Sequence, residues 1–181
     1  GLGELTTKKN WGMLIRVAAE TKRRGLDLRW VVAGEGPERT RLERLAAQLG
    51  VAGEVRFPGY RADVESFTKG LDILVHTSRA EATAGTGRMA MLAGVPVVAV
   101  GTRGVVETIG DLGIAVALDD DRAMADAIER LVRDEAFRSH LTARASAHAR
   151  AHFGIEAMVA GNLRVYESVL GVPVPRCEDV P

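Results

Sequence analysis

Two glycine-bearing loops carry the residue types that bind phosphate and sugar. In the loop at 3–10, glycine lets the backbone approach a ligand closely, and a lysine can neutralise a phosphate as a point charge. In the loop at 77–88, small residues and free amides at the start of a helix suit an anion, and Glu81 can accept hydrogen bonds from hydroxyl groups. Together the loops predict a site for a ligand that carries both phosphate and hydroxyl groups.

Short apolar runs alternate along the chain with longer helical patterns, which is typical of βαβ units and a mainly parallel sheet. Several runs are almost continuously apolar, as expected for strands buried on both faces. The predicted strands are 28–33, 55–57, 73–76, 95–100 and 114–118. The predicted helices are 10–24, 37–50, 62–69, 87–93, 104–109, 121–132, 134–151 and 155–170.

This pattern predicts an α/β fold, a doubly wound, mainly parallel sheet with helices on both faces. Ligands of such sheets bind beyond the carboxyl ends of the strands, where loops lead into helices. The loops at 3–10 and 77–88 lie at such places, and a third strand-to-helix loop follows at 101–107. We therefore expect all three loops at one edge of the sheet.

The composition favours a soluble α/β domain and argues against several other classes. The 181 residues contain 24 basic and 24 acidic side chains, so no net charge attracts nucleic acid. Cys177 is the single cysteine, which excludes an internal disulfide and a thiolate metal cluster and fits a reducing, cytoplasmic setting. No apolar run approaches the roughly 20 residues of a membrane span, although surface attachment to a membrane stays open.

Other conspicuous residues have ordinary structural interpretations. Gly34–Pro37 predicts a tight turn followed by a helix that starts at the proline, rather than a phosphate cradle. His76 ends a buried strand and is interpreted as a core residue. His148 and His152 are four residues apart, but no glutamate follows His148 as it does in metalloproteases, so a solvated helix face is the better interpretation.

We expect one domain over residues 1–171 and a tail over 172–181, which holds three prolines and several charged residues. A doubly wound sheet normally begins with a strand that leads into its first ligand-facing loop. Here the loop at 3–10 comes first, so the first strand is expected to be truncated.

The loops and strands, taken together, resemble the donor-binding domain of retaining GT-B glycosyltransferases of group 1, also called family 4. The resemblance covers roughly residues 3–170. Seven segments carry it in the family's order: GEL with KN in 3–10, VVAGEGP in 31–37, VRFPGYRADV in 55–64, LDILVHTSRAE in 71–81, AMLAGVPVVA in 90–99, Gly104 with Glu107, and GDLG in 110–113. The resemblance implies a Rossmann-like domain that forms one half of a GT-B fold.

The resemblance also implies a role for individual residues. Lys9, beside Gly3, would pair with the diphosphate of a nucleoside-diphosphate sugar, and Glu81 would act as the catalytic carboxylate that binds hydroxyls of the transferred sugar. Charge on the departing diphosphate must be stabilised by fixed cations and amides, and this requires no metal or other cofactor. The remaining implied binding residues are Arg61 and Asp63 near the base, Ala84, Gly85 and Thr86 near the phosphate, Arg88 and Met89 on the following helix, and Glu107 beside the loop.

Two residues depart from the family's pattern. Met89 stands where the family usually has a second glutamate that binds the ribose hydroxyls, and methionine cannot accept those hydrogen bonds. Glu4 replaces an arginine found in many members, although some carry glutamate there. A rebuilt loop that brings Arg88 near phosphate would give a variant donor site, whereas a degenerate site would have lost strong donor binding.

The leading hypothesis is therefore a glycosyltransferase donor domain that transfers a sugar to an acceptor held by an absent N-terminal domain, with this piece inactive alone. The alternative from another class is a noncatalytic binding or scaffolding module that keeps the fold, for which Met89 is the best support. A GT-B sugar-nucleotide epimerase is a third hypothesis. The stretch at 90–99 and the late helices resemble the transferase more closely.

Overall fold

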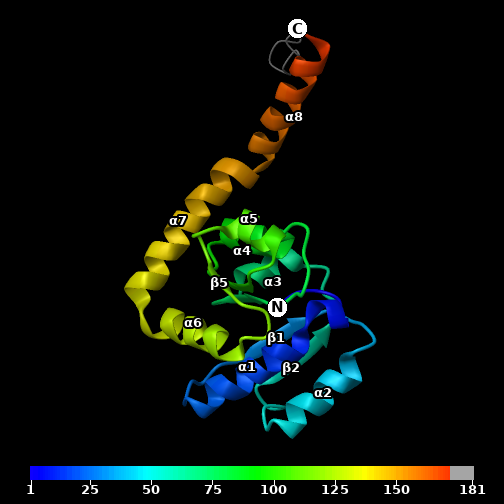
Figure 1. Ribbon diagram of the computed structural model, residues 1–181, viewed down its shortest axis with the longest axis vertical. Helices are drawn as coiled ribbons and strands as arrows, with labels where there is room; N and C mark the ends of the chain where they lie inside the picture. The colour runs from blue at the N-terminus through cyan, green and yellow to red at the C-terminus, as the bar shows by residue number, and fades with distance from the viewer. Residues whose placement is uncertain (172–181) are drawn as a thin grey trace.

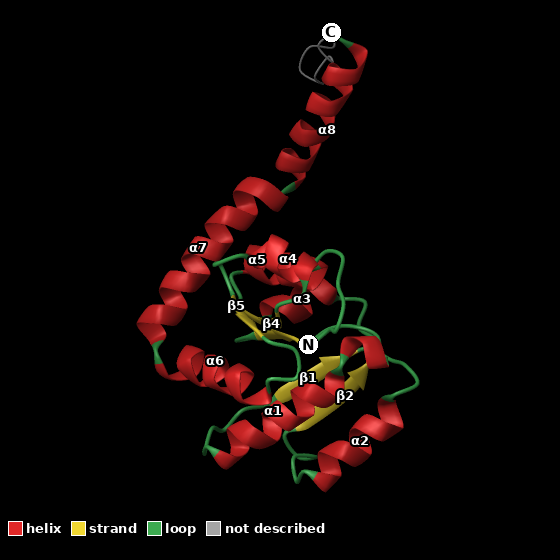
Figure 2. Ribbon diagram, viewed as in Figure 1, coloured by secondary structure: helices red, strands yellow, loops and turns green. Residues whose placement is uncertain are grey.

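Parallel strands flanked by helices make up the body of the protein, as a computed structural model shows for residues 1–171 (Figures 1 and 2). The predicted tail at 172–181, with Cys177, lies outside the described residues. The strands are β1 (Trp30–Ala33), β2 (Val55–Gly59), β3 (Leu74–His76), β4 (Val97–Val100) and β5 (Ile114–Val116). The helices are α1 (Trp11–Arg23), α2 (Arg39–Gln48), α3 (Val64–Lys69), α4 (Gly85–Ala93), α5 (Arg103–Ile109), α6 (Asp121–Arg133), α7 (Glu135–Phe153) and α8 (Ile155–Leu170), with a 3-10 turn η1 (Thr7–Lys9).

The strands form two parallel sheets rather than the single sheet that the sequence predicts. One sheet pairs β1 with β2, and the other has the order β3-β4-β5. Every pairing is parallel, for example Leu74 with Val97 and Val98 with Ile114. The fold class is therefore confirmed. The break in the sheet falls between β1 and β3, and residues 1–3 lie beside β1 there, where Leu2 forms an isolated parallel bridge to Ala33.

Strand β4 lies in the middle of its sheet and is buried along its whole length. Its side chains alternate between two apolar clusters, because successive residues of a strand point to opposite faces. Val98 and Val100 pack in the cluster that holds α1 and α6, and Val97 and Ala99 pack in the cluster that holds α4 and α7. The apolar run at 95–100 thus reflects burial on both faces, as predicted.

Helix α2 is shorter at both ends than the sequence predicts. The helix begins at Arg39, two residues after the predicted start, because Pro37 and Glu38 form a turn first. It ends at Gln48, two residues before the predicted end, and Gly50 follows with a φ of 69°, a backbone conformation that glycine adopts without strain.

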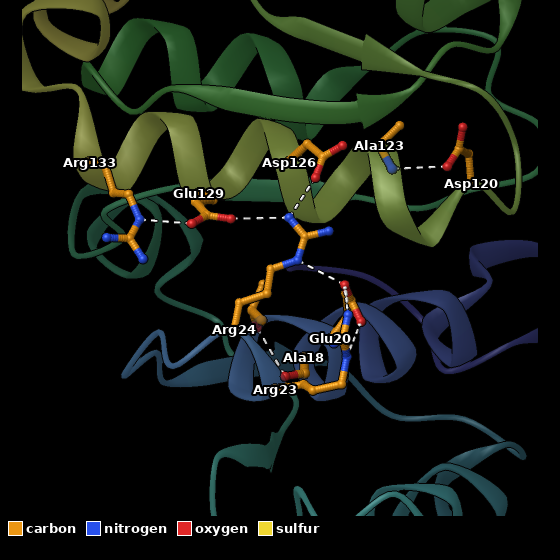
Figure 3. Close-up of polar contacts among 10 residues, drawn as sticks. Ala18, Glu20, Arg23, Arg24, Asp120, Ala123, Asp126, Glu129 and Arg133 are labelled. Carbon is orange, nitrogen blue, oxygen red and sulfur yellow. Dashed lines mark hydrogen bonds and ion pairs between the residues drawn. The ribbon is translucent and has the colours of Figure 1, made fainter.

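A network of ion pairs joins α1 to α6 beside the apolar contacts (Figure 3). Arg24 donates to Glu20 at 2.8 Å on its own helix and to Asp126 and Glu129 on α6. Hydrogen bonds from Arg23 and Arg24 lower the pKa of Glu20 to about 2. These side chains also line a cavity of about 880 Å³. These charged side chains lie at the surface and pair with one another. We therefore interpret them as contacts between α1 and α6 and not as a ligand site.

The last helix, α8, extends away from the body of the molecule (Figure 1). It follows Gly154, whose extended backbone separates it from α7. Its large apolar side chains are exposed: Ile155, Met158, Val159, Val165, Tyr166, Val169 and Leu170. Within residues 1–171, no helix combines the length and the apolar character needed to cross a membrane.

Candidate functional site

The loops at 3–10 and 77–88 meet at the carboxyl ends of the strands, where the sequence predicts a ligand. Lys9 in η1 forms an ion pair with Glu81, which follows β3. The side chain of Lys9 is 25% exposed and that of Glu81 is 14% exposed. The two residues on which the sequence hypothesis depends are thus neighbours, and both reach solvent at one edge.

Hydrogen bonds between the two loops hold this pair in place. The Arg79 amide donates to the Lys8 carbonyl at 2.9 Å, and the Thr77 hydroxyl donates to the Lys9 carbonyl at 2.8 Å. Asn10 turns the chain into α1 with a φ of 53°, a left-handed conformation that asparagine tolerates better than most residues. The position of Lys9 is therefore set by the backbone around it and by the end of β3.

The surroundings of Glu81 favour its carboxylate form. Burial opposes ionisation, but hydrogen bonds from Lys9 and Ser78 outweigh it and hold the pKa of Glu81 below its ordinary value. Ser78 is itself buried at the end of the same strand. Glu81 is thus a charged hydrogen-bond acceptor, suited to hydroxyl groups.

His76 lies beneath this ion pair at the end of β3. Its Nε2 is 3.5 Å from a carboxylate oxygen of Glu81, and its residue is 6% exposed. Burial lowers the pKa of His76, so the ring is neutral when Glu81 is ionised at neutral pH. Its Nδ1 has no hydrogen-bond partner among residues 1–171, so His76 is buried as predicted but is not fully hydrogen-bonded.

The start of α4 lies four residues after Glu81, and there the Gly85 amide donates to the Thr83 carbonyl at 2.6 Å. Ala84 precedes the first turn, and Gly85 and Thr86 open it. The first amides of a helix lack partners within the helix, and the helix dipole makes this end attractive to anions. Cation, carboxylate and amides therefore follow one another along the same edge of the sheet.

Helix α5 packs closely against the backbone of the Glu81 loop at Gly104. A Cβ added at Gly104 would collide with the carbonyl oxygens of Glu81 and Ala82. We therefore expect Gly104→Ala to displace this loop and to lower the free energy of unfolding by about 1–3 kcal/mol, measured by chemical denaturation. Gly161→Ala is the control, because within residues 1–171 no atom beyond its chain neighbours and its own helix backbone lies within 4 Å of a Cβ there. Equal stability of both variants would contradict the close packing.

The structure does not bring every predicted residue to the Lys9–Glu81 pair. A Cβ on Gly3 would lie 3.3 Å from the Lys9 side chain, so these two are neighbours. The others have contacts of their own: Arg61 pairs with Asp63, Glu107 pairs with Arg103 at 2.8 Å, and Arg88 lies over the Phe153 ring at 5.5 Å. Met89 is half-buried on α4. Their roles toward a ligand stay predictions.

Several residues that build the site were not predicted from the sequence. Thr77 and Arg79 join the loops, and Asp119 accepts hydrogen bonds from Asn10 and Arg79 at 3.2 Å each. Asp119 follows β5 and has a φ of 59°. A polar residue just beyond a strand end was the available signal, because strand ends share one edge in a parallel sheet.

Known proteins with related sequences are glycosyltransferases. The family described as "Glycosyl transferases group 1" matches residues 2–148. The lipopolysaccharide core biosynthesis glycosyltransferase LpsE of Rhizobium meliloti (strain 1021) is 31% identical over 92% of this chain and 48% of its own length. The 2-deoxystreptamine glucosyltransferase of Streptomyces kanamyceticus is 29% identical over 75% of this chain and 36% of its own. The chain thus spans half or less of the length of these relatives.

Solved structures agree in fold. HepE of Anabaena, solved in complex with UDP, has a TM-score of 0.82 and 25% identity over 94% of this chain and 48% of its own. The C-terminal domain of the group 1 family protein LpcC of Francisella tularensis has a TM-score of 0.76 and 23% identity over 86% of this chain and 85% of its own. A parallel α/β core, a cation and a carboxylate at its ligand edge, and a family match over residues 2–148 lead to one conclusion: this chain belongs to the group 1 glycosyltransferases.

Proposed function

We propose that this domain binds the nucleoside-diphosphate sugar from which a retaining glycosyltransferase transfers its sugar. The observation that carries the proposal is the Lys9–Glu81 ion pair at the ligand edge of the sheet. Its cation suits a diphosphate, and its carboxylate suits sugar hydroxyls. HepE, which is 25% identical to this chain, was solved with UDP-glucose as well as with UDP, which supports a nucleotide sugar as the ligand.

Before the donor binds, Lys9 and Glu81 form the ion pair seen in the structure. A bound diphosphate would draw the Lys9 ammonium away from Glu81, since the diphosphate carries more negative charge than one carboxylate. The bond between the anomeric carbon and the diphosphate oxygen then breaks, and its electron pair stays on that oxygen. Lys9 and the amides of Ala84 and Thr86 stabilise this charge, and Glu81 holds the sugar through its hydroxyls. An acceptor hydroxyl then bonds to the anomeric carbon and passes its proton to the departing diphosphate.

The arrangement assigns no step to a metal ion, because Lys9 and the amides supply the positive field. We propose that a separate N-terminal domain holds the acceptor, that Arg61 and Asp63 face the base, and that Glu107 supports the site from α5. Peripheral membrane association of the whole enzyme belongs to the same proposal. The isolated 181-residue chain is then expected to bind the donor weakly and to show no turnover.

A noncatalytic module is the second candidate, and two observations favour it. Met89 is half-buried on α4, where it cannot accept ribose hydrogen bonds. Arg88 is engaged by Phe153 of α7 rather than pointing to the Lys9–Glu81 pair. Both features would weaken donor binding while leaving the fold intact.

Calorimetric titration of the chain with UDP, GDP, ADP and their sugars separates the two candidates. A donor domain is expected to bind one nucleoside diphosphate, and to bind its sugar derivative differently because Glu81 contacts the sugar. If none of these ligands binds, the result would favour the noncatalytic module. Sugar transfer by the 181-residue chain alone would contradict the need for a second domain.

A further inference from the structure

Two nitrogen atoms lie against the same carboxylate oxygen of Glu81. The Lys9 ammonium donates to Oε1 of Glu81, and Nε2 of His76 is 3.5 Å from that oxygen. The exposed fraction of the side chain rises from 8% at His76 to 14% at Glu81 and 25% at Lys9, so the imidazole is the most deeply buried of the three. Glu81 therefore has two neighbours that can donate to it, a buried ring and an ammonium group that reaches solvent.

The position of His76 is fixed by the strand that carries it. His76 is the last residue of β3, and it pairs with Ala99 of the central strand β4. Its neighbours in the chain, Val75 and Thr77, are both buried, and the Thr77 hydroxyl donates to the Lys9 carbonyl at 2.8 Å. The backbone of His76 is thus held in the sheet, whereas the Lys9 ammonium ends a flexible four-carbon stem.

The charges around His76 favour a neutral ring while Lys9 is in place. Burial is the largest cause that holds the pKa of His76 below its ordinary value. The Glu81 carboxylate acts in the opposite direction, and the Lys9 ammonium adds to the effect of burial. The ring therefore stays neutral next to the ion pair, and the ammonium of Lys9 is one of the reasons.

Other charged side chains of the surrounding elements have contacts of their own. Arg79, in the same loop as Glu81, pairs with Asp119 at 3.0 Å. Arg88, the single charged residue of α4, lies over the Phe153 ring. Strand β4, which pairs with β3, is apolar over residues 97–100. We therefore expect the protonation of the ring to follow the state of the Lys9–Glu81 pair.

Withdrawal of Lys9 from Glu81 would favour a bond between the two groups that remain. The Glu81 carboxylate is partly buried, and a buried charge without a partner is unfavourable. His76 would at the same time lose the repulsion of the ammonium, so its ring would bind a proton more tightly. Both changes favour an imidazolium that donates its Nε2–H to Oε1 of Glu81.

We propose that His76 is a positioning residue that replaces Lys9 as the partner of Glu81 whenever the ammonium is withdrawn. The ring takes up a proton from solvent and donates to the carboxylate, so Glu81 stays ionised and in place. That a donor diphosphate is the group that withdraws Lys9 rests on the proposed function. In the donor complex Lys9 would then contact the diphosphate, while His76 holds Glu81 toward the sugar hydroxyls.

The first test needs no nucleotide, because Lys9→Met removes the ammonium permanently. The ring signals of His76 are followed by NMR as the pH is varied, in the 181-residue chain and in Lys9→Met. Loss of a like charge, together with a free carboxylate beside the ring, should raise the midpoint of the His76 titration by about one pH unit or more. This corresponds to a rise in proton affinity of about tenfold or more.

The other histidines serve as internal references. His140, His148 and His152 all lie on α7, and their midpoints should not respond to Lys9→Met. The His76 signal is assigned by its absence from His76→Gln. If that chain does not fold, the signal is assigned by elimination from variants of the three histidines on α7.

Two comparisons separate the exchange of partners from a general change in charge. Lys8→Met removes an equal charge from an exposed residue of the same turn and should leave the His76 midpoint almost unchanged. In a Glu81→Gln background, Lys9→Met should raise the midpoint much less, because only the repulsion by Lys9 is then lost. The proposal is overturned if Lys9→Met leaves the midpoint where it is, or if the rise is equally large without the Glu81 carboxylate.

Nucleotide binding then tests the link to the donor. Saturating UDP, with GDP and ADP tried in turn, should raise the His76 midpoint of the parent chain as Lys9→Met does. Binding without such a rise would contradict the exchange of partners in the donor complex. If none of the three nucleotides binds, the proposed function fails, and the comparison of Lys9→Met with the parent chain decides the role of His76 independently.

Discussion

Replacing Lys9 with methionine is expected to weaken the binding of the nucleoside diphosphate by roughly 10- to 100-fold. Charge-assisted hydrogen bonds contribute about 1.5–3 kcal/mol, and methionine keeps the length of the side chain without its charge. The same change leaves the partly buried Glu81 without its ion-pair partner. Titration calorimetry with the nucleotide that binds the parent chain measures the loss.

Two further variants show whether the loss of nucleotide affinity is specific to the Lys9–Glu81 pair. Lys8 is exposed on the same turn, so Lys8→Met removes an equal charge and should leave the affinity almost unchanged. Glu81→Gln should retain affinity for the nucleoside diphosphate and reduce the difference between it and its sugar derivative. If Lys9→Met and Lys8→Met bind equally well, the diphosphate does not lie at the Lys9–Glu81 pair.

The stability of the chain is expected to rise steeply as the pH increases from 5 to 8. Burial between β1 and β3 lowers the pKa of the Gly1 amino group from 8.0 to about 5. Between these values the unfolded chain binds a proton that the folded chain does not, so unfolding takes up a proton and becomes harder as the pH rises. At 1.36 kcal/mol for each pH unit, the effect reaches at most about 4 kcal/mol.

Acetylation of Gly1 isolates this contribution. The acetylated chain has no titrating amine but keeps every histidine and carboxylate, so the difference between the two stability profiles belongs to the amine. Denaturant unfolding at pH 5, 6, 7 and 8 should show the unmodified chain losing stability toward pH 5 relative to the acetylated one. Parallel profiles would mean that the Gly1 nitrogen is solvated.

Much of the fold could be predicted from short-range patterns. The apolar run at 95–100 indicates a strand buried on both faces, and the structure places alternate residues of β4 in different clusters. Such patterns can be recognised in the sequence because strand and helix periodicities involve residues that are close together along the chain. The start of α2 was misplaced by two residues, since the turn at Pro37 and Glu38 forms before the helix.

The candidate site could be predicted only in outline. Ligands of parallel sheets bind at the carboxyl ends of the strands, and both loops lie at such ends. Lys9 and Glu81 could therefore be placed on the same edge of the sheet. The contact of Arg88 with Phe153 could not be predicted, because it depends on where α7 packs, whereas Glu107 pairs with Arg103 four residues earlier on the same helix. A side chain's direction depends on its neighbours in space, which a motif does not encode.

The amino-acid sequence by itself determined the parallel α/β class, the order of the elements and the residue types at the ligand edge, because these follow from local periodicity and backbone preference. Tertiary structure alone decided that Lys9 lies against Glu81, that His76 sits beneath them with an unpartnered nitrogen, and that a groove separates β1 from β3. Lys9 and Glu81, for example, are 72 positions apart in sequence. Such contacts exist only after the strands have paired and the helices have packed over them.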